Sequence, residues 1–176
     1  MSHVRNNKIV TPKDEWGTPS TIFDPLDDEF DFDMDAAASW HNKKVPYAFT
    51  KENSALENDW LVSGKRFYLN PPFSLIKEFL EKAYKESQRG ALVVCLLPID
   101  GSTGWWHDYV LKSSEIRFIR GRVRYIGYDE DGKQIANSPM FSSCVVIFSD
   151  GRSLIRSLIR RPSIGLSIEV KKHAIA

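Results

Sequence analysis

Apolar and acidic residues alternate over residues 30 to 35, in the sequence FDFDMD. A period of two predicts a β-strand, and the small residues that follow, AAAS, indicate that the chain turns closely past a neighbouring segment. Upstream of this strand, residues 18 to 30 are typical of a turn that opens a short helix, with Thr18 or Ser20 as the N-terminal cap. The first 40 residues therefore predict a helix followed by a strand.

A strand, an amphipathic helix and another strand are predicted between residues 66 and 98. The sequence RFYLNPPF predicts the first strand, and Ser74 is placed to cap the helix. Residues 91 to 98, ALVVCLLP, are a continuous apolar run, which is typical of a strand buried on both faces of a parallel sheet. Such a βαβ unit has a right-handed crossover, so its helix covers one face of the sheet. The apolar face of this helix consists of Leu75, Ile76, Phe79, Leu80 and Ala83.

A strand, a turn and a strand are predicted between residues 115 and 148. Asp131-Gly132 is a hairpin signal, and the apolar run CVVIF at residues 144 to 148 predicts a core strand. Beyond it, residues 152 to 161 place apolar and arginine side chains on opposite faces of an amphipathic helix. Together with the βαβ unit, these elements predict a three-layer α/β domain with an antiparallel element near the C-terminus.

The 176 residues of the chain suffice for one globular domain. We expect a flexible N-terminus (residues 1–13), the domain itself (residues 14–150) and a basic C-terminal tail (residues 151–176) of helix plus a short extended segment. Apolar runs fall short of the ~20 residues that span a membrane, and no signal-peptide core is present, so the sequence predicts a cytoplasmic protein. Cys95 and Cys144 lie in apolar runs and are interpreted as buried thiols, and no metal site is expected.

Charge is distributed unevenly along the chain. Residues 112–176 hold 12 Lys and Arg against 6 Asp and Glu, whereas the rest of the chain holds 12 against 17. A basic third on an otherwise acidic chain indicates that a polyanion lies against one side. Arg120, Arg122 and Arg124 alternate along a predicted strand, so they share a face that either contacts phosphates or is a solvated face with salt bridges. Arg117 is out of phase with them and points elsewhere.

The tetrapeptide Asn70-Pro71-Pro72-Phe73 stands where a predicted strand ends and a helix begins. Ligands of open α/β sheets bind beyond the carboxyl ends of the strands. The two prolines fix φ at about −65° and donate no hydrogen bond, so their carbonyls are held rigidly. The side-chain oxygen of Asn70 beside a prolyl carbonyl provides two acceptors, and Phe73 provides a flat ring. These features fit the NH2 group of a planar base.

Such a pocket suits methyl transfer to an exocyclic amine. The amino group of adenine is a poor nucleophile because its lone pair is delocalised into the ring. Two acceptors that take both N–H protons localise the lone pair on nitrogen, and these hydrogen bonds strengthen in the transition state. The electrophile is then a methyl sulfonium, which reacts without a metal.

The tetrapeptide NPPF fits the [DNS]-P-P-[YFW] motif of amino-group methyltransferases that use S-adenosylmethionine. With DEWGTP, FDFDMDAAAS, DWLVSGKRFYLNPPFS, VVCLLPIDGSTGWWHD and EIRFIRGRVRY in this order, residues 14 to 148 resemble the phage-type, Dam-like DNA adenine-N6 methyltransferases. The resemblance implies a mostly parallel, Rossmann-like class I methyltransferase sheet. It also implies methylation of an adenine flipped out of double-stranded DNA, in a bacterial host cell, with protection of phage DNA from restriction.

The resemblance assigns roles to the tetrapeptide. Asn70 and the Pro71 carbonyl hold the target amine, Pro72 belongs to the same catalytic motif, and Phe73 stacks on the base. The arginines at 120, 122 and 124 are then the DNA-binding candidates.

It also assigns residues to the cofactor. Asp35 lies at its methionine end, Asp59 accepts from its adenine amine, and Glu52 is a candidate ribose ligand. One departure from the family is the missing glycine-rich turn, since alanine does not take positive φ cheaply. The remaining cofactor-binding candidates are Trp16, Thr18, Pro19, Ala36, Ala37 and Ser39.

Three alternatives stay open at this point. A protein-glutamine methyltransferase also carries an NPP-aromatic motif, although it needs no basic third. A cytosine-N4 methyltransferase more often has Ser as the first residue of the motif. A DNA-binding relative that lost catalysis keeps the fold, although the intact Asn70 and Asp35 argue against it.

Overall fold

A computed structural model of the chain describes residues 12–128, 133–137 and 139–150. The predicted hairpin turn at Asp131-Gly132 and the predicted helix over residues 152 to 161 lie outside the described residues, as does the rest of the C-terminal tail.

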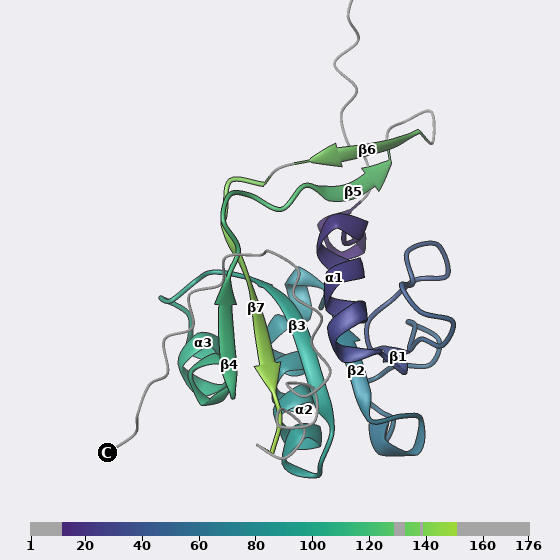
Figure 1. The fold of residues 1–176 in the computed structure, drawn as a ribbon, viewed down its shortest axis with the longest axis vertical. Coiled ribbons are helices and arrows are strands. Elements are labelled where there is room, and N and C mark those ends of the chain that lie inside the picture. The colour runs from purple at the N-terminus through teal and green to yellow at the C-terminus, as the bar shows by residue number, and fades with distance from the viewer. Residues whose placement is uncertain (1–11, 129–132, 138, 151–176) are drawn as a thin grey trace, which may run out of the picture.

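Five strands form the central sheet in the order β1-β2-β3-β7-β4 (Figure 1). β1 (Met34–Asp35), β2 (Arg66–Leu69) and β3 (Leu92–Pro98) are parallel. β7 (Ser143–Phe148) is antiparallel both to β3 and to β4 (Glu115–Phe118), so β4 runs in the same direction as β3. The sheet is therefore mostly parallel, with one antiparallel strand, and the predicted α/β class is confirmed.

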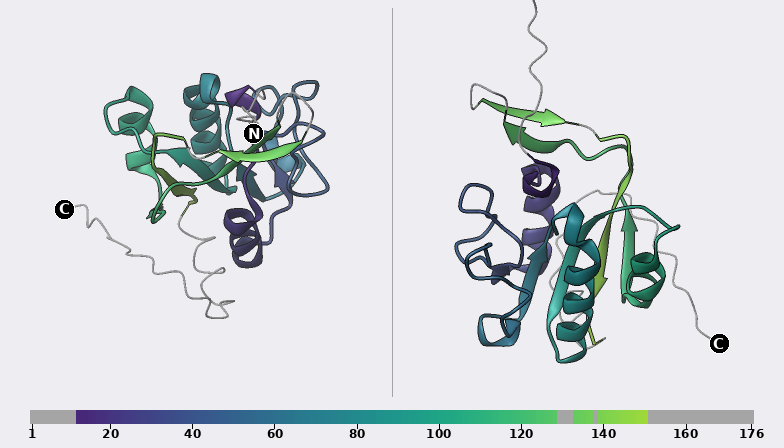
Figure 2. Two further views of the ribbon diagram at one scale, coloured as in Figure 1. Left: turned by 90° about the horizontal axis from the view of Figure 1, so that it is seen from above. Right: turned by 180° about the vertical axis from the view of Figure 1, so that it is seen from behind.

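Helices cover both faces of this sheet, and the left view of Figure 2 shows the three layers from above. α1 (Ser20–Phe30) packs on one face, and α2 (Ile76–Gln88) and the short α3 (Gly104–Asp108) pack on the other. Short 3-10 turns connect the larger elements: η1 (Lys13–Glu15), η2 (Trp60–Val62), η3 (Phe73–Leu75) and η4 (Val110–Lys112).

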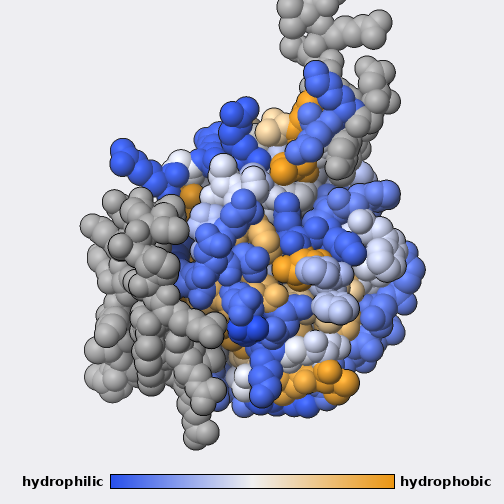
Figure 3. Space-filling model, turned by 45° about the vertical axis from the view of Figure 1, so that its right-hand side comes forward, coloured by the Kyte–Doolittle hydropathy of each residue, from blue (hydrophilic) through white to orange (hydrophobic). Residues whose placement is uncertain are grey.

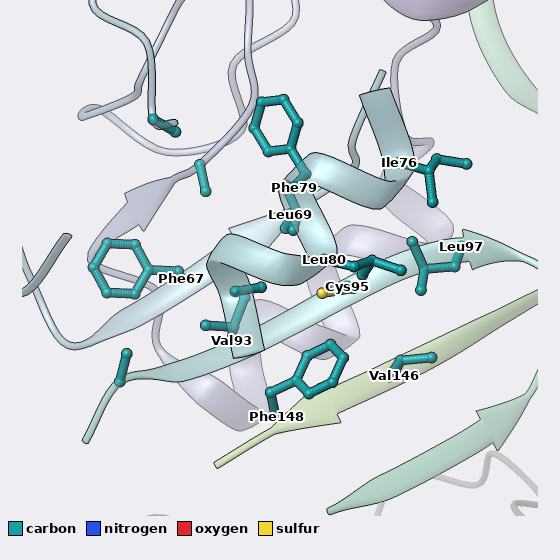
Figure 4. Close-up of a cluster of buried hydrophobic side chains, with 14 of the residues drawn as sticks. Phe67, Leu69, Ile76, Phe79, Leu80, Val93, Cys95, Leu97, Val146 and Phe148 are labelled. Carbon is teal, nitrogen blue, oxygen red and sulfur yellow. The ribbon is translucent and has the colours of Figure 1, made fainter. Parts of the chain in front are cut away.

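Alternation within the strands divides the core in two. Successive side chains of a strand point to opposite faces, so Phe67 and Leu69 of β2 pack toward α2, whereas Tyr68 packs toward α1. β3 is buried on both faces, as its continuous apolar run predicts. Figure 4 shows the α2 side of the core, where Phe79 and Leu80 lie over the sheet.

The alternating segment at residues 30 to 35 contains less strand than its pattern predicts. Phe30 ends α1, Asp31 takes a left-handed conformation with φ 54°, and only β1 pairs with β2. Phe32 joins the α1 side of the core and Met34 joins the α2 side. The apolar residues of this segment are therefore buried without forming one continuous strand. The expected strand is wrong except at Met34–Asp35.

The expected helix caps are also wrong. Pro19 precedes α1 and no side chain caps it, because the Thr18 hydroxyl hydrogen-bonds instead to the hydroxyl of Tyr68, 2.6 Å away. Ser74 lies inside η3 and its hydroxyl donates to Asp14. Both hydroxyl groups thus hold remote segments of the chain.

A separate two-stranded sheet lies above the carboxyl ends of the parallel strands (Figure 1). It consists of β5 (Tyr125–Tyr128) and β6 (Gln134–Asn137), and their antiparallel pairing is the one that the predicted hairpin requires. The arginine segment just before it is not a strand, because the chain bends at Gly121 with φ 83°. The expectation of one arginine-bearing strand is therefore wrong.

Over the described ranges, no helix is long and apolar enough to cross a membrane, and no group of three or more His, Cys, Asp or Glu residues is arranged to hold a metal. Cys95 and Cys144 are buried free thiols, as expected. Figure 3 shows a face on which hydrophilic residues predominate and apolar residues form separate patches.

Candidate active site

The carboxyl ends of β1 and β2 bring two of the predicted site segments to the same edge of the sheet. Asp35 pairs with Tyr68 in the parallel register, and the backbone N–H of Ala36 donates to the Tyr68 carbonyl at 2.7 Å. Asn70 is the first residue after β2. The end of β1 and the NPPF tetrapeptide are therefore neighbours.

Asn70 is held in one orientation by its own amide group. The side-chain NH2 donates to the backbone carbonyl of Trp16 at 2.8 Å. This bond fixes the other end of the amide as the acceptor, and Oδ1 accepts no hydrogen bond from any described residue. The half-buried side chain therefore keeps its carbonyl oxygen available for a ligand.

The two prolyl carbonyls have different partners. The Pro72 carbonyl accepts the backbone N–H of Leu75 at 3.0 Å, which opens the 3-10 turn that leads into α2. The carbonyl of the buried Pro71 accepts no hydrogen bond from the described part of the chain. Asn70 and Pro71 thus supply two free acceptors from adjacent residues.

Phe73 belongs to a cluster of four aromatic rings. Its ring centroid lies 6.2 Å from that of Trp16 and 6.3 Å from that of Tyr125, both in edge-to-face contacts, and 5.4 Å from that of Phe141. Tyr125 and Trp16 are buried, whereas Phe73 stays partly exposed. The cluster fixes the orientation of the Phe73 ring and leaves part of its surface accessible.

Asp35 is buried, with 3% of its surface exposed. One carboxylate oxygen accepts the backbone N–H of Ala37 at 3.2 Å, and the other accepts that of Lys44 at 3.1 Å. Burial raises the pKa of Asp35 to about 6, although these two hydrogen bonds and the charge of Lys44 oppose the rise. The carboxylate therefore shapes the loop over residues 36 to 44 and carries a charge that the protein compensates only in part.

The edge of the sheet beside β1 is covered by residues 47 to 49. The backbone N–H of Asp35 donates to the Tyr47 carbonyl at 3.0 Å, and the N–H of Phe49 donates to the Asp35 carbonyl at 2.9 Å, in a parallel bridge. Glu52 follows this segment and accepts a hydrogen bond from the Thr50 hydroxyl at 2.7 Å, which lowers its pKa. An acid therefore follows a strand-like segment beside β1.

Three predicted cofactor residues lie in or next to the segment over residues 14 to 18. Trp16 packs against Phe73, and Thr18 is buried with its hydroxyl on Tyr68. Pro19, half-buried, precedes α1.

The small residues after β1 surround the same edge. Ala36 is fully buried, Ala37 and Ser39 are partly exposed, and the Ser39 backbone N–H donates to the Asn42 side chain at 2.7 Å. The loop therefore closes through Asn42, and residues 36 to 44 contain no glycine.

Asp59 is not brought to this edge. Its carboxylate caps η2 and forms an exposed ion pair with Arg89, 2.8 Å away, just beyond the C-terminal end of α2. Arg89 precedes the start of β3, so this pair lies at the amino ends of the parallel strands. The structure therefore separates Asp59 from Asn70 and Asp35.

The four arginines of the basic third that the structure describes divide into two groups. Arg120, Arg122 and Arg124 are exposed, in the segment between β4 and the hairpin. Arg117 is buried and pairs with Glu29 of α1 and Glu115 of β4 at 2.6 and 2.8 Å. As expected, Arg117 points elsewhere, and it ties α1 to the sheet.

Sequence reasoning missed Asp14. Its carboxylate accepts both the backbone N–H of Ser74, at 3.0 Å, and the Ser74 hydroxyl. The two residues are 60 positions apart, so only their types, an acid and a hydroxyl beside known motifs, were visible in the sequence.

Comparison with known proteins agrees with this geometry. The family described as DNA N-6-adenine-methyltransferase (Dam) matches residues 5–172. The chain is 34% identical over 134 residues to the DNA N-6-adenine-methyltransferase of Haemophilus phage HP1 (strain HP1c1), covering 74% of this chain and 76% of that protein. It is 32% identical over 127 residues to the protein of the same name from Escherichia phage T1, covering 72% of this chain but only about half, 52%, of that protein. The resemblance seen in the motifs is thus confirmed, and the chain belongs to the DNA N-6-adenine-methyltransferase (Dam) family.

Proposed function

We propose that the protein transfers a methyl group from S-adenosylmethionine to the N6 amine of an adenine flipped out of double-stranded DNA. The observation that carries the proposal is the orientation of Asn70, whose NH2 is bonded to the Trp16 carbonyl while Oδ1 and the Pro71 carbonyl stay free. The names of the two phage relatives support adenine as the target. In the sheet order, the antiparallel strand β7 lies between the parallel strands β3 and β4. This order supports a Rossmann-like class I methyltransferase fold.

The two acceptors act on the amine directly. Oδ1 of Asn70 accepts one N–H of the amine and the Pro71 carbonyl accepts the other, so the lone pair localises on nitrogen. Transfer would form the N–CH3 bond as the S–CH3 bond of the sulfonium breaks to leave a neutral thioether, and it would make the nitrogen cationic. This charge strengthens both hydrogen bonds and gives preferential binding of the transition state. The methylated amine is then strongly acidic and releases one proton to solvent.

Phe73 receives the flipped base. Extrusion of a base costs a few kcal/mol, and stacking on an aromatic side chain returns about 1–3 kcal/mol. Trp16, Tyr125 and Phe141 hold the Phe73 ring from the side, so little ordering remains when the base arrives. Stacking and the two acceptors together offset the cost of extrusion.

The residues at the carboxyl end of β1 fit S-adenosylmethionine. A buried carboxylate without a full counter-charge is expected where a cationic ligand binds, and Asp35 has the raised pKa of such a group. When bound, the cofactor supplies an electrophilic methyl group on a sulfonium. Asp35 would face its cationic methionine end, Ala36, Ala37 and Ser39 would leave room for it, and Glu52 would accept from its ribose hydroxyls.

The salt dependence of DNA binding is expected to show whether Arg120, Arg122 and Arg124 contact phosphates. Each lost phosphate contact makes the negative slope of log K against log[salt] shallower by about 0.9. Replacement of Arg120, Arg122 and Arg124 together by Gln should lower the slope of DNA binding by about two to three, with cofactor affinity unchanged. Fluorescence anisotropy over a salt series measures it. An unchanged slope would show that these exposed side chains only face solvent.

The proposed function is tested by methyl incorporation. Labelled S-adenosylmethionine is supplied with long unmethylated DNA or with a protein extract, and the DNA product is digested to nucleosides. We expect label in DNA as N6-methyladenine. Label in protein glutamine, label as N4-methylcytosine, or DNA binding without transfer would each contradict the proposal in favour of one of the three alternatives.

A further inference from the structure

Residues 14 to 18, which we call the N-terminal strap, contact a different part of the site with each residue. The Glu15 carbonyl accepts from the side chain of Asn42 at 3.2 Å. Gly17 and Ile126 of β5 exchange two backbone hydrogen bonds of 2.8 Å. Thr18 reaches Tyr68 in β2. The strap therefore joins the loop after β1, the hairpin and the central sheet.

The strap also holds the NPPF tetrapeptide at both of its ends. The Trp16 carbonyl takes the amide of Asn70, which is the first residue of the tetrapeptide. Asp14 takes two hydrogen bonds from Ser74, the residue directly after Phe73. Two strap residues only two positions apart thus fix the acceptor and the stacking ring relative to each other.

The contact between Asp14 and Ser74 involves a charged carboxylate. The hydrogen bond from the Ser74 side chain, together with those from the backbone N–H groups of Ser74 and Phe73, lowers the pKa of Asp14 although burial opposes the change. The carboxylate therefore stays ionised at neutral pH. Since Asp14 and Ser74 are both exposed, the contact adds little to the hydrophobic core, and its main effect is on the geometry of the turn.

We propose that Asp14 is a positioning residue for methyl transfer, acting through Ser74 on Phe73 and the start of the turn into α2. The inference rests on the proposed function and deepens it. Transfer requires the amine to be held in a near-attack geometry, and a misplacement of about 1 Å can cost about 100-fold in rate. Without Asp14, the end of NPPF that carries Phe73 loses its hydrogen-bonded anchor, while the Asn70 end keeps its own.

The test uses the full chain with four single variants and one double variant, and it measures the rate, the cofactor affinity and the melting temperature. Asp14→Ala removes the two hydrogen bonds from Ser74, Asp14→Asn keeps an acceptor, and Ser74→Ala removes only the hydroxyl donor. Glu15→Gln is the matched control, because the Glu15 side chain lies in the same strap and, among the described residues, forms only an exposed ion pair with Lys51. Single-turnover methylation of long unmethylated DNA gives the rate, and calorimetry with S-adenosylhomocysteine gives cofactor affinity.

We expect the single-turnover rate of Asp14→Ala to fall about 10- to 100-fold, with smaller losses for Asp14→Asn and Ser74→Ala. Cofactor affinity should not change in any variant, and Glu15→Gln should match the wild type. The double variant Asp14→Ala/Ser74→Ala should be no slower than Asp14→Ala, because both changes remove one interaction.

Two outcomes would overturn the inference alone. The first is an Asp14→Ala protein whose folded fraction methylates DNA at the wild-type rate, even if its melting temperature falls. The second is an equal loss of cofactor affinity and rate, which would indicate a general collapse of the site. A wild-type protein that methylates no DNA would instead remove the proposed function, and this inference with it.

Discussion

Replacement of Asp35 by alanine is expected to weaken cofactor binding by one to two orders of magnitude. A charge-assisted contact between a buried carboxylate and a cationic group contributes about 1.5–3 kcal/mol, which corresponds to about 10- to 100-fold in affinity. Calorimetric titration with S-adenosylmethionine measures the change. Asp28→Ala, which removes an exposed carboxylate on α1, is the matched control and should bind as the wild type does. Unchanged affinity in a folded Asp35→Ala protein would exclude Asp35 from the cofactor site.

The raised pKa of Asp35 leads us to expect that cofactor affinity depends on pH. Burial raises the pKa of Asp35 to about 6, and only the ionised form attracts a cation. The dissociation constant should therefore be flat above about pH 6 and rise by up to about tenfold for each pH unit below it. Asp35→Ala should lose this dependence. An equal slope in that variant would assign the titration to another group.

Protein stability should respond to pH in the opposite sense. Because the pKa of Asp35 in the folded state lies above its ordinary value of 3.8, the folded protein binds this proton more tightly than the unfolded chain does. The stabilisation by this group is complete below about pH 3.8 and is lost as the pH rises through about 6. The cofactor would compensate this buried charge, so the rise in melting temperature on cofactor binding should be larger at about pH 7.5 than at about pH 5.

The sequence predicted the part of the site that depends on neighbouring positions. The apolar run before Asn70 and the amphipathic run after Phe73 require a strand and a helix with the tetrapeptide between them, and the structure has this order. The end of β1 was found for the same reason, since small residues directly follow a buried acid. Local patterns therefore located Asn70 at the carboxyl end of a strand, whereas the family resemblance assigned Asp35 to the cofactor.

At two positions the backbone conformation differs from the strand that the sequence pattern predicts. Asp31 adopts a left-handed conformation and ends α1 inside a segment with strand periodicity, so tertiary packing decided that segment. Gly121 takes φ 83°, which a residue without a Cβ allows, and it interrupts the expected arginine strand. Val123 and Tyr125 are nevertheless buried and alternate with the exposed Arg122 and Arg124, so the predicted separation of apolar and basic faces is retained in part.

Long-range pairs were beyond sequence reasoning. Asp14 accepts a hydrogen bond from Ser74, and Asn70 donates one to the Trp16 carbonyl. Each pair is more than 50 positions apart in the sequence, and the pairs meet because the chain before α1 crosses the carboxyl edge of the sheet. Asp59 was expected near the cofactor from its position before a motif, but it pairs with Arg89 at the other end of the sheet. Single residue types do not specify such partners.

Asn70→Ala is expected to show the largest loss of activity. Removal of one preorganised acceptor typically costs about 100- to 1,000-fold in kcat. Cofactor and DNA binding should persist, because the Oδ1 hydrogen bond forms with the target amine and strengthens in the transition state. Asn53→Ala, at an exposed asparagine, is the matched control and should keep full activity.

Asn70→Asp separates the acceptor from the orienting contact. The carboxylate keeps an acceptor of the same shape, but it loses the NH2 group that donates to the Trp16 carbonyl at 2.8 Å. Two oxygens then face each other, so the side chain should turn or shift. We expect partial activity, above that of Asn70→Ala and below that of the wild type, and equal rates for Asp and Ala would mean that orientation matters as much as the acceptor.

The central claim is that Oδ1 of Asn70 accepts a hydrogen bond from the target amine during methyl transfer. Its most direct test is the single-turnover rate of Asn70→Ala on an unmethylated adenine-containing duplex, measured beside its melting temperature and its affinity for S-adenosylhomocysteine. The predicted result is a folded, cofactor-binding protein that methylates about 100- to 1,000-fold more slowly than the wild type. A stable, cofactor-binding Asn70→Ala protein with the wild-type rate would contradict the claim, because Asn70 would then only support the turn before the two prolines.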